Sequence, residues 1–404
     1  MPRSLGSVSG MEALGDRLRE ARKRSGLTQR ELAQLAGLSL SLVRKLEQGT
    51  YGDVRLETVH RLAVVLRVPT SALAGGDAPV PDERAAVEWE PVRRALEDQP
   101  DGTPGDQNEP TLAGVRAAFG EVLPLLLAGR FAELGGLLAP LLRDADALVA
   151  SSADGTLAQA RTLRAQIRQV AGSLMLHVWQ FEAADRAFGL AMADAGDLLT
   201  ACSVAEEQCW GLVRQGRLAD CQALALRWAD ECEPKMTATR DELAAWGRLL
   251  IRGSASAVRD NQPREAAEML RLAGMAAAGT GGDFLLPHAQ WHVFGPVTVS
   301  VMAAENAMIG DRPGATLAIA RELAGSRVPV PRYAPSHKLD VAAAHTALRQ
   351  YPEAIGVLTQ LRQSRPEWLR QQRYAADILH KIIRRRRSLT GEIRDLADFV
   401  RLPL

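Results

Sequence analysis

Aromatic residues and cysteines are scarce in this chain of 404 residues, and long apolar runs are missing. No apolar stretch approaches the roughly 20 residues that a bilayer-spanning helix needs. No secretory signal is recognisable at the start of the sequence. These absences argue against a membrane or secreted protein, so we expect a cytoplasmic protein with no membrane partner.

The cysteines argue against a zinc centre or a disulfide framework. The four of them stand at positions 202, 209, 221 and 232, and none forms a closely spaced C-x-x-C pair. Free cysteine is among the most buried residue types. We therefore expect four reduced, buried thiols, with a metal or redox role as the alternative.

The motifs of several common enzyme classes are also absent. The sequence contains no G-x-x-x-x-G-K-[ST], no H-E-x-x-H and no G-x-S-x-G. We therefore expect a protein that is not an enzyme, with no catalytic residue, no cofactor and no metal site.

Charge is balanced over the whole chain but not along it. The formal net charge is +1, yet residues 11–75 hold nine Arg and two Lys against seven acidic residues. Residues 76–110 hold ten acidic residues against three Arg. A basic block before an acidic one is typical of a phosphate-binding domain on a solvated linker. Ordinary surface variation is the alternative.

The apolar pattern predicts an all-α protein. Residues 1–10 are expected to be a flexible tail, and the helical spacing over residues 11–75 predicts a compact five-helix domain. Gly, Pro and acidic residues predict an acidic linker over residues 76–110, with one short helix near residues 85–96. Residues 111–404 show no convincing strand alternation and are predicted to form one large helical domain.

A turn pattern recurs in the large helical domain at intervals of about 36 to 50 residues. Each instance places a polar or Gly turn before an Ala-bearing helix start: AGRFAEL at 128, WQFEAAD at 179, RQGRLAD at 214, NQPREAA at 261, GDRPGAT at 310 and RQYPEAI at 349. Stacked helical hairpins of the tetratricopeptide-like kind explain both the spacing and the small residues. A globular helical bundle is the alternative.

Residues 28–49, TQRELAQLAGLSLSLVRKLEQG, have the pattern of two short helices joined at a corner. Thr28 with Glu31 predicts a capping box at the first helix. Gly37 stands where the turn can require a positive φ. The apolar side chains that the corner must bury are Leu32, Ala33, Ala36, Leu38, Val43 and Leu46.

This pattern resembles the helix-turn-helix of the phage-repressor-like (XRE-type) regulators, with flanking helices expected at 14–25 and 56–66. The resemblance implies that the second helix, residues 39–48, enters the major groove of double-stranded DNA while the first lies across the backbone. The predicted DNA-binding residues are Gln29, Ser39, Leu40, Ser41, Arg44, Lys45 and Arg55.

Particular roles follow from the same resemblance. Arg44 or Lys45 can donate to guanine, and Leu40 can touch a thymine methyl group. Gln29 is expected to bind a phosphate at the N-terminus of the first helix.

Two further positions of the motif have competing interpretations. In related repressors the positions of Arg22 and Glu47 form a buried ion pair, so a structural role for Arg22 is preferred over DNA contact. Leu42 either packs inside the domain or at a dimer seam, or contacts DNA.

Aromatic residues gather in the stretch FLLPHAQWHVFGPVTVSVMAAENAMIGDRPGA, residues 284–315. It resembles an FGPTN motif followed by a Gly-Asp-Pro turn in actinobacterial regulators that join this helix-turn-helix to a tetratricopeptide-like domain. Val299 replaces the Asn of that motif. A pocket for an effector is predicted at a helix start here, with the lining residues Phe284, His288, Trp291, His292 and Phe294.

The alternatives for this stretch are ordinary. Trp and Phe in a helical solenoid usually form core. His288 and His292 can ligate a metal from one helix face, but solvated or hydrogen-bonded histidines are the preferred interpretation because no third ligand is near in sequence. The four consecutive Arg at 384–387 are expected on a solvated helix face, with a phosphate or acidic-linker contact as the alternative.

Together these features predict a transcriptional regulator. We expect a homodimer that binds an inverted-repeat operator through two recognition helices about 34 Å apart. The helical domain is expected to dimerise and to sense a small molecule or peptide. The alternative is a protein-interaction scaffold whose helical repeats recruit a partner and in which DNA binding is secondary.

Overall fold

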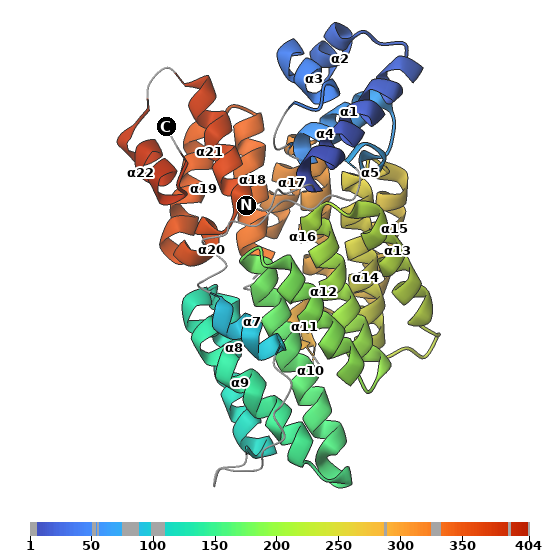
Figure 1. The fold of residues 1–404 in the computed structure, drawn as a ribbon, viewed down its shortest axis with the longest axis vertical. Helices are drawn as coiled ribbons and strands as arrows, with labels where there is room; N and C mark the ends of the chain where they lie inside the picture. Colours follow the sequence, from blue (N-terminus) through green and yellow to red (C-terminus); the bar gives the residue numbers. More distant parts are fainter. Residues whose placement is uncertain are drawn as a thin grey trace.

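The computed structural model describes residues 6–50, 54, 56–74, 89–97, 110–286, 289–324, 333–386 and 389–402. Almost all of these residues are helical, and the only sheet among them is one hairpin of two short strands. The predicted all-α fold, with a small N-terminal domain and a large domain of helical repeats, is confirmed (Figure 1).

The N-terminal domain consists of five helices. They are α1 (Gly6–Arg24), α2 (Gln29–Leu35), α3 (Leu40–Glu47), α4 (Leu56–Leu66) and α5 (Thr70–Ala74). Leu18, Leu32, Val43 and Leu62 are fully buried at its centre. The expectation of a loose tail over residues 1–10 is wrong for the part from Gly6 onward, because the backbone is already helical there.

The large domain is a series of antiparallel helical hairpins. Their helices are α8 (Leu112–Ala128), α9 (Phe131–Ser151), α10 (Asp154–His177), α11 (Phe181–Asp194), α12 (Leu198–Gln215), α13 (Leu218–Glu231), α14 (Arg240–Arg259), α15 (Pro263–Gly279), α16 (Pro296–Ile309), α17 (Pro313–Leu323), α18 (Tyr333–Ala347) and α19 (Tyr351–Ser364). The short α20 (Pro366–Arg370) precedes a last pair, α21 (Arg373–Arg385) and α22 (Gly391–Phe399).

Each of the six predicted turns joins the two helices of one hairpin. In every one a single residue takes a left-handed conformation, with φ between 54° and 76°: Gly129, Trp179, Gly216, Asn261, Asp311 and Arg349. The helix that precedes each turn packs on the next hairpin as well as on its own partner. This arrangement is a stack of repeats, in which each hairpin buries its apolar side against its neighbours.

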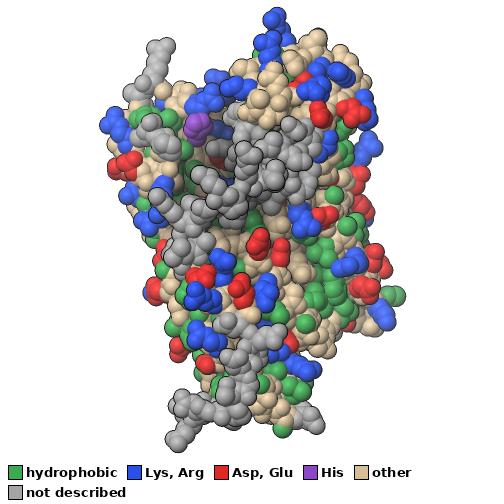
Figure 2. Space-filling model, in the orientation of Figure 1, with side chains coloured by type: hydrophobic (Ala, Val, Ile, Leu, Met, Phe, Trp, Pro, Cys, Tyr) green, Lys and Arg blue, Asp and Glu red, His purple; other side chains and the backbone are tan. Residues whose placement is uncertain are grey.

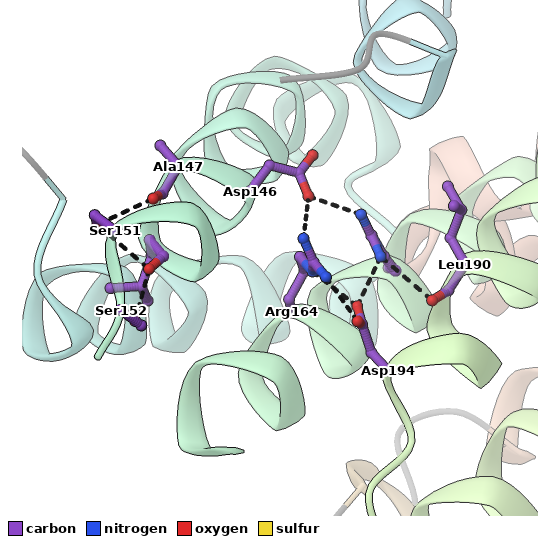
Figure 3. Close-up of polar contacts among 9 residues, drawn as sticks. Asp146, Ala147, Ser151, Ser152, Arg164, Leu190 and Asp194 are labelled. Carbon is purple, nitrogen blue, oxygen red and sulfur yellow. Dashed lines mark hydrogen bonds and ion pairs between the residues drawn. The ribbon is translucent and has the colours of Figure 1, made fainter. Parts of the chain in front are cut away.

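A buried ion network holds the second hairpin against the first. Arg164 and Arg168, one turn apart on α10, each pair with Asp146 of α9 and Asp194 of α11 (Figure 3). The four N–O distances lie between 2.6 and 3.1 Å. Two cations shared by two carboxylates leave no uncompensated charge in this interior.

The range predicted as an acidic linker contains a packed helix. Helix α7 (Glu90–Glu97) packs on α9 and α11. Val92 and Leu96 of α7 and Trp89, which directly precedes it, are buried. Gly135 of α9 permits this contact, because a Cβ there would lie 2.7 Å from the Trp89 ring.

The segment that was expected to start a helix forms a β-hairpin instead. Strand β1 (Phe284–Leu286) pairs antiparallel with β2 (Ala289–Phe294), between α15 and α16. Asp283 then caps α16, accepting hydrogen bonds from the backbone N–H groups of Val297 (2.9 Å) and Thr298 (3.0 Å). Gly295 is required at the crossing, because a Cβ there would lie 2.5 Å from Asp283 Cα.

The C-terminal part of the large domain returns to its first hairpins. The Glu367 carboxylate accepts from the backbone N–H of Ala132 at 3.2 Å, and Trp368 packs on Gly129. The Trp179 indole N–H donates to the carbonyl of Gln371 at 3.1 Å. The two ends of the repeat stack are therefore in direct contact.

The N-terminal domain docks on the turn between α14 and α15. Asp260 accepts hydrogen bonds from the backbone N–H (2.6 Å) and hydroxyl (3.0 Å) of Ser71, and so caps α5 from the other domain. The carbonyl of Arg259 lies 2.7 Å from the Thr70 hydroxyl and 2.8 Å from His60 Nδ1. Lys381 of α21 pairs with Glu57 of α4 at 2.6 Å. The two domains are thus joined by polar contacts besides the chain itself.

The sequence predicts buried, reduced cysteines and no membrane-spanning helix. All four cysteines are free and buried, as expected. In the part of the chain that the structure describes, no helix has the length and apolarity needed to cross a membrane.

Candidate nucleic-acid interface

The corner between α2 and α3 is built as the sequence predicts. Thr28 and Glu31 form a complete capping box, in which the Thr28 N–H donates to Glu31 Oε2 at 2.8 Å. Gly37 has φ +63°, a conformation that a side chain would strain. Ser39 caps α3 by accepting from the Leu42 N–H at 3.2 Å. Both helix starts and the turn are therefore fixed locally.

Helix α3 presents two distinct faces. Val43, Leu46 and Glu47 point into the domain and are buried. Ser41, Arg44, Lys45 and Gln48 are all exposed and follow the spacing i, i+3, i+4, i+7. That spacing places four hydrogen-bonding side chains on one stripe of the helix.

The outward stripe of α3 is free of the large domain. Helices α2 and α3 lie at the end of the molecule that points away from the repeats (Figure 1). Lys and Arg side chains gather on this end of the N-terminal domain (Figure 2). A polyanion could therefore reach α3 without any movement of the two domains.

The predicted DNA-binding residues differ in their exposure and packing. It brings Ser41, Arg44 and Lys45 together on the outward stripe, with Ser39 exposed at the N-cap just before them. Leu40 is half-buried and packs on the domain core. Arg55 lies outside the described residues.

Gln29 and Leu42 have structural contacts of their own. The Gln29 side-chain amide donates to Glu47 Oε2 at 2.8 Å, so part of its hydrogen-bonding capacity serves the domain. Leu42 is half-buried and packs on the core, which agrees with the first of its two interpretations.

Arg22 and Glu47 form the expected ion pair. Arg22 Nε and Nη2 donate to the two Glu47 carboxylate oxygens at 2.6 and 2.9 Å. Arg22 Nη1 also donates to the Leu27 carbonyl at 2.9 Å. Burial alone would raise the pKa of Glu47, but the hydrogen bonds from Arg22 and Gln29 lower it below its usual value. Glu47 therefore stays charged and holds α1, α2 and α3 together.

Three basic residues near this surface were not predicted from the sequence. Arg30 is exposed in the first turn of α2. Arg61 of α4 donates to the Gly37 carbonyl at 3.0 Å, and Arg19 of α1 donates to the Glu47 carbonyl. In the sequence, only their place in the basic block of residues 11–75 pointed to this surface. The contacts of Arg61 and Arg19 could not be predicted, because they join residues that are 24 and 28 positions apart.

The aromatic residues of the predicted effector pocket lie mostly in the interior. Trp291 and Phe294 are fully buried core residues, whereas Phe284 is half-buried beneath the Arg240 guanidinium at 4.3 Å. His288 lies outside the described residues. The expected helix start is wrong, because the segment is a β-hairpin, whereas the effector pocket itself stays a prediction.

His292 belongs to a buried ion network, which agrees with the hydrogen-bonded interpretation. Its Nδ1 contacts Arg248, and its Nε2 lies 2.7 Å from Glu207 Oε1. Burial would raise the pKa of Glu206, but Arg248 and Arg252 hold it at about 2. Glu206, Glu207 and His292 offer ligand atoms within 4.8 Å of one another. Arg248 and Arg252 both pair with Glu206, and His292 faces Glu207, so these side chains form an ion network with one another.

The arginine run at 384–387 divides between two environments. Arg384 and Arg385 are exposed at the end of α21, as expected for a solvated face. Arg386 lies over the Tyr351 ring at 5.9 Å. Arg387 lies outside the described residues.

Comparison with known proteins bears on the N-terminal domain. Residues 13–74, which span α2 to α5 and most of α1, match the family described as a helix-turn-helix domain. The N-terminal domain is a helix-turn-helix domain.

One curated relative matches the helix-turn-helix part. It is RghRB of Bacillus subtilis (strain 168), described as an uncharacterized HTH-type transcriptional regulator. It is 37% identical over 76 residues, which are 18% of this chain and 55% of the relative. The chain thus spans about half the length of that curated relative.

A solved structure with a wider alignment is that of Bacillus thuringiensis PlcR in complex with the peptide PapR7 and DNA. It covers 67% of this chain and 96% of its own, at 13% identity and a TM-score of 0.26. So low a TM-score supports no shared architecture, and the fold described above rests on this chain's own helices.

Proposed function

We propose that this protein is a DNA-binding transcriptional regulator of the phage-repressor-like (XRE) type. The observation that carries the proposal is the outward stripe of α3, where Ser41, Arg44, Lys45 and Gln48 stand exposed on a helix that a capped, glycine-dependent corner fixes in place. The helix-turn-helix match over residues 13–74 supports it.

The residues of the interface divide by chemistry. Arg44 and Lys45 are donors for guanine O6 and N7 in the major groove, and Ser41 donates or accepts at either base pair. The N-terminus of α2 and Arg30 face the backbone phosphates, because free N–H groups and positive charge favour an anion there. One hydrogen of the Gln29 side-chain amide is used by Glu47, and the second is left to donate to a backbone phosphate at this helix end. Leu40 has little exposed surface left for a thymine methyl group.

The same proposal includes a homodimer on an inverted repeat. One small domain buries little surface on DNA, and two copies about 34 Å apart would read two successive major grooves. The tetratricopeptide-like repeats offer the dimer surface and the sensor for a small-molecule or peptide effector. The protein acts in the cytoplasm, where its DNA is.

The test of this proposal is the affinity for double-stranded DNA, measured at a series of salt concentrations. A regulator that makes about six phosphate contacts shows a log–log slope near −5 on double-stranded DNA. The full chain is titrated, by fluorescence anisotropy, onto DNA from upstream of its own reading frame and onto unrelated DNA. A scaffold whose repeats recruit a protein partner would show no salt-dependent DNA affinity, and this result would overturn the proposal.

The Lys45→Ala variant separates base recognition from phosphate contact. Loss of a base contact should weaken binding to the preferred site by about 1 to 3 kcal/mol and leave unrelated DNA almost unchanged. An equal loss on both DNAs would make Lys45 a phosphate contact. Lys23→Ala, on the exposed end of α1, removes the same charge and is the control.

A further inference from the structure

The large domain contains an arginine whose charge and hydrogen-bond donors are not matched by the protein. Arg214 lies in the last turn of α12, and its Nε and Nη2 atoms are buried without a hydrogen-bond partner. No carboxylate among the described residues forms an ion pair with it. An unpaired cation in a buried position is costly, so its retention needs a physical reason.

Aromatic rings supply part of that reason. The Arg214 guanidinium carbon lies 4.3 Å from the centre of the Trp179 ring and 5.3 Å from that of Trp210. Such contacts stabilise a cation through the ring faces. The rings provide no lone pair in the plane of the buried N–H groups. The carbonyls at the end of α12 accept none of these hydrogens either.

A second arginine strengthens the positive field at the same ring. Arg373, at the start of α21, places its guanidinium carbon 4.0 Å from the centre of the Trp179 ring. The two guanidinium carbons are therefore no more than about 8 Å apart, well within the distance at which like charges repel. Burial, followed by repulsion from Arg373, lowers the pKa of Arg214 to about 10. Arg373 is exposed, so this side of the cluster is open to solvent.

We propose that Arg214 and Arg373 form a binding site for an oxyanion ligand, a carboxylate or a phosphate group, at the edge of the Trp179 ring. A planar guanidinium donates two parallel hydrogen bonds to such a group. A rotation of the Arg214 side chain toward Arg373 would give its unpaired donors this partner. The negative charge also relieves the repulsion between the two arginines. The aromatic rings of Trp179 and Trp210 provide an apolar wall for the rest of the ligand.

The position of this site gives an anion a route to the helix-turn-helix domain. Trp179 lies in the turn between α10 and α11, and its indole N–H holds the Gln371 carbonyl just before α21. Two turns further along α21, Lys381 pairs with Glu57 of α4. A ligand that draws Arg373 toward Arg214 would move the helix that touches the DNA-binding domain. This regulatory consequence rests on the proposed function, whereas the binding itself does not.

The test is direct binding to the full chain, without DNA, by calorimetry and thermal unfolding at constant ionic strength set with chloride. The probes are inorganic phosphate, N-acetylglycine as a peptide-like carboxylate, and N-acetylglycinamide, its neutral counterpart. We expect one of the two anions to bind and raise Tm, and the amide to do neither. The anion that binds distinguishes a phosphoryl ligand from a carboxylate ligand.

Variants assign the binding to the cluster. Arg214→Gln should weaken binding at least about tenfold and Arg373→Gln several-fold, because each loses a charged bidentate donor. Arg227→Gln is the matched control, since Arg227 is also exposed over a tryptophan, at 6.0 Å from the Trp228 ring, but stands away from the cluster. Arg373→Gln keeps the test valid if Arg214→Gln fails to fold.

Three results would overturn the site: neither anion binds the unaltered protein up to about 10 mM, the amide binds as well as the acid, or Arg214→Gln and Arg373→Gln bind like Arg227→Gln. Failure of the site is distinguishable from failure of the proposed function. DNA binding without anion binding rejects only the site, and anion binding without DNA binding rejects only the regulator.

Discussion

Glu47 is the residue on which the α2–α3 corner depends most. Its carboxylate accepts from Arg22 on α1 and Gln29 on α2, while Glu47 itself lies on the inner face of α3. It is only 2% exposed, so the pair with Arg22 is largely shielded from water. Removing one partner of such a pair leaves the other charge buried and uncompensated.

Glu47→Gln should lower the local stability of the helix-turn-helix by about 3 kcal/mol, because Arg22 loses its counter-ion. Hydrogen exchange of the peptide that covers residues 28–49 measures this as faster amide exchange. Glu20→Gln is the control, since Glu20 forms an exposed pair with Arg24 within one helix and should cost well under about 1 kcal/mol. Equal exchange in the two variants would contradict the bracing role of Glu47.

At the scale of elements, helix ends and turns carry the specificity of this fold. The six hairpin turns share one left-handed residue, which is Gly in two of them and Asn, Asp, Trp or Arg in the others. Helix α5 is capped by Asp260, a residue of the turn between α14 and α15. The N-terminal domain thus depends on the large domain to complete its last helix.

Asp260→Ala should remove this cap at a cost of about 0.5 to 2 kcal/mol, the usual effect of losing an N-cap acceptor. The backbone N–H of Ser71 then loses its acceptor, so amide exchange over residues 56–74 should rise and small-angle scattering should show a less compact molecule. Asp220→Ala, which removes an exposed carboxylate paired with Arg217 on α13, should change neither measurement. An unchanged Asp260→Ala protein would mean that the docking does not need the cap.

At the scale of the whole molecule, the docked arrangement should depend on pH through His60. His60 Nδ1 faces the Arg259 carbonyl and the Thr70 hydroxyl at the domain contact. Burial lowers the pKa of His60 below its ordinary value, although the hydrogen bond to Arg259 acts in the opposite direction. The docked state therefore favours the neutral ring.

The sign of the pH effect follows from this shift. Undocked His60 takes up a proton near its ordinary pKa of about 6.5, whereas docked His60 does so only at lower pH. Docking should thus weaken as pH falls below about 6.5 and continue to weaken through the lowered pKa. Small-angle scattering at pH values of about 7.5 and 5.5 measures it. His60→Gln should reduce the dependence, whereas His345→Gln, whose ring on α18 contacts Gln350, should not. A dependence that survives in His60→Gln would contradict this assignment.

The sequence by itself determined the local features of this protein. Helical periodicity, the Thr28–Glu31 capping box, the positive φ at Gly37 and the six hairpin turns depend on residues a few positions apart, so each could be predicted. The outward placement of Ser41, Arg44 and Lys45 follows from the same local spacing once α3 is known to be a helix.

Only the tertiary structure decided which distant residues meet. The docking of α5 on Asp260 joins residues 189 positions apart, and the contact of Arg214 with Trp179 joins residues from different helical hairpins. The β-hairpin at 284–294 is local in sequence, but its strands are held by packing against the large domain. The strands could not be predicted from the sequence, because it lacks the alternation of polar and apolar residues that a half-exposed sheet shows. Most of the side chains of β2 are buried in the domain. Such contacts depend on how whole hairpins pack, and local sequence carries no signal for that packing.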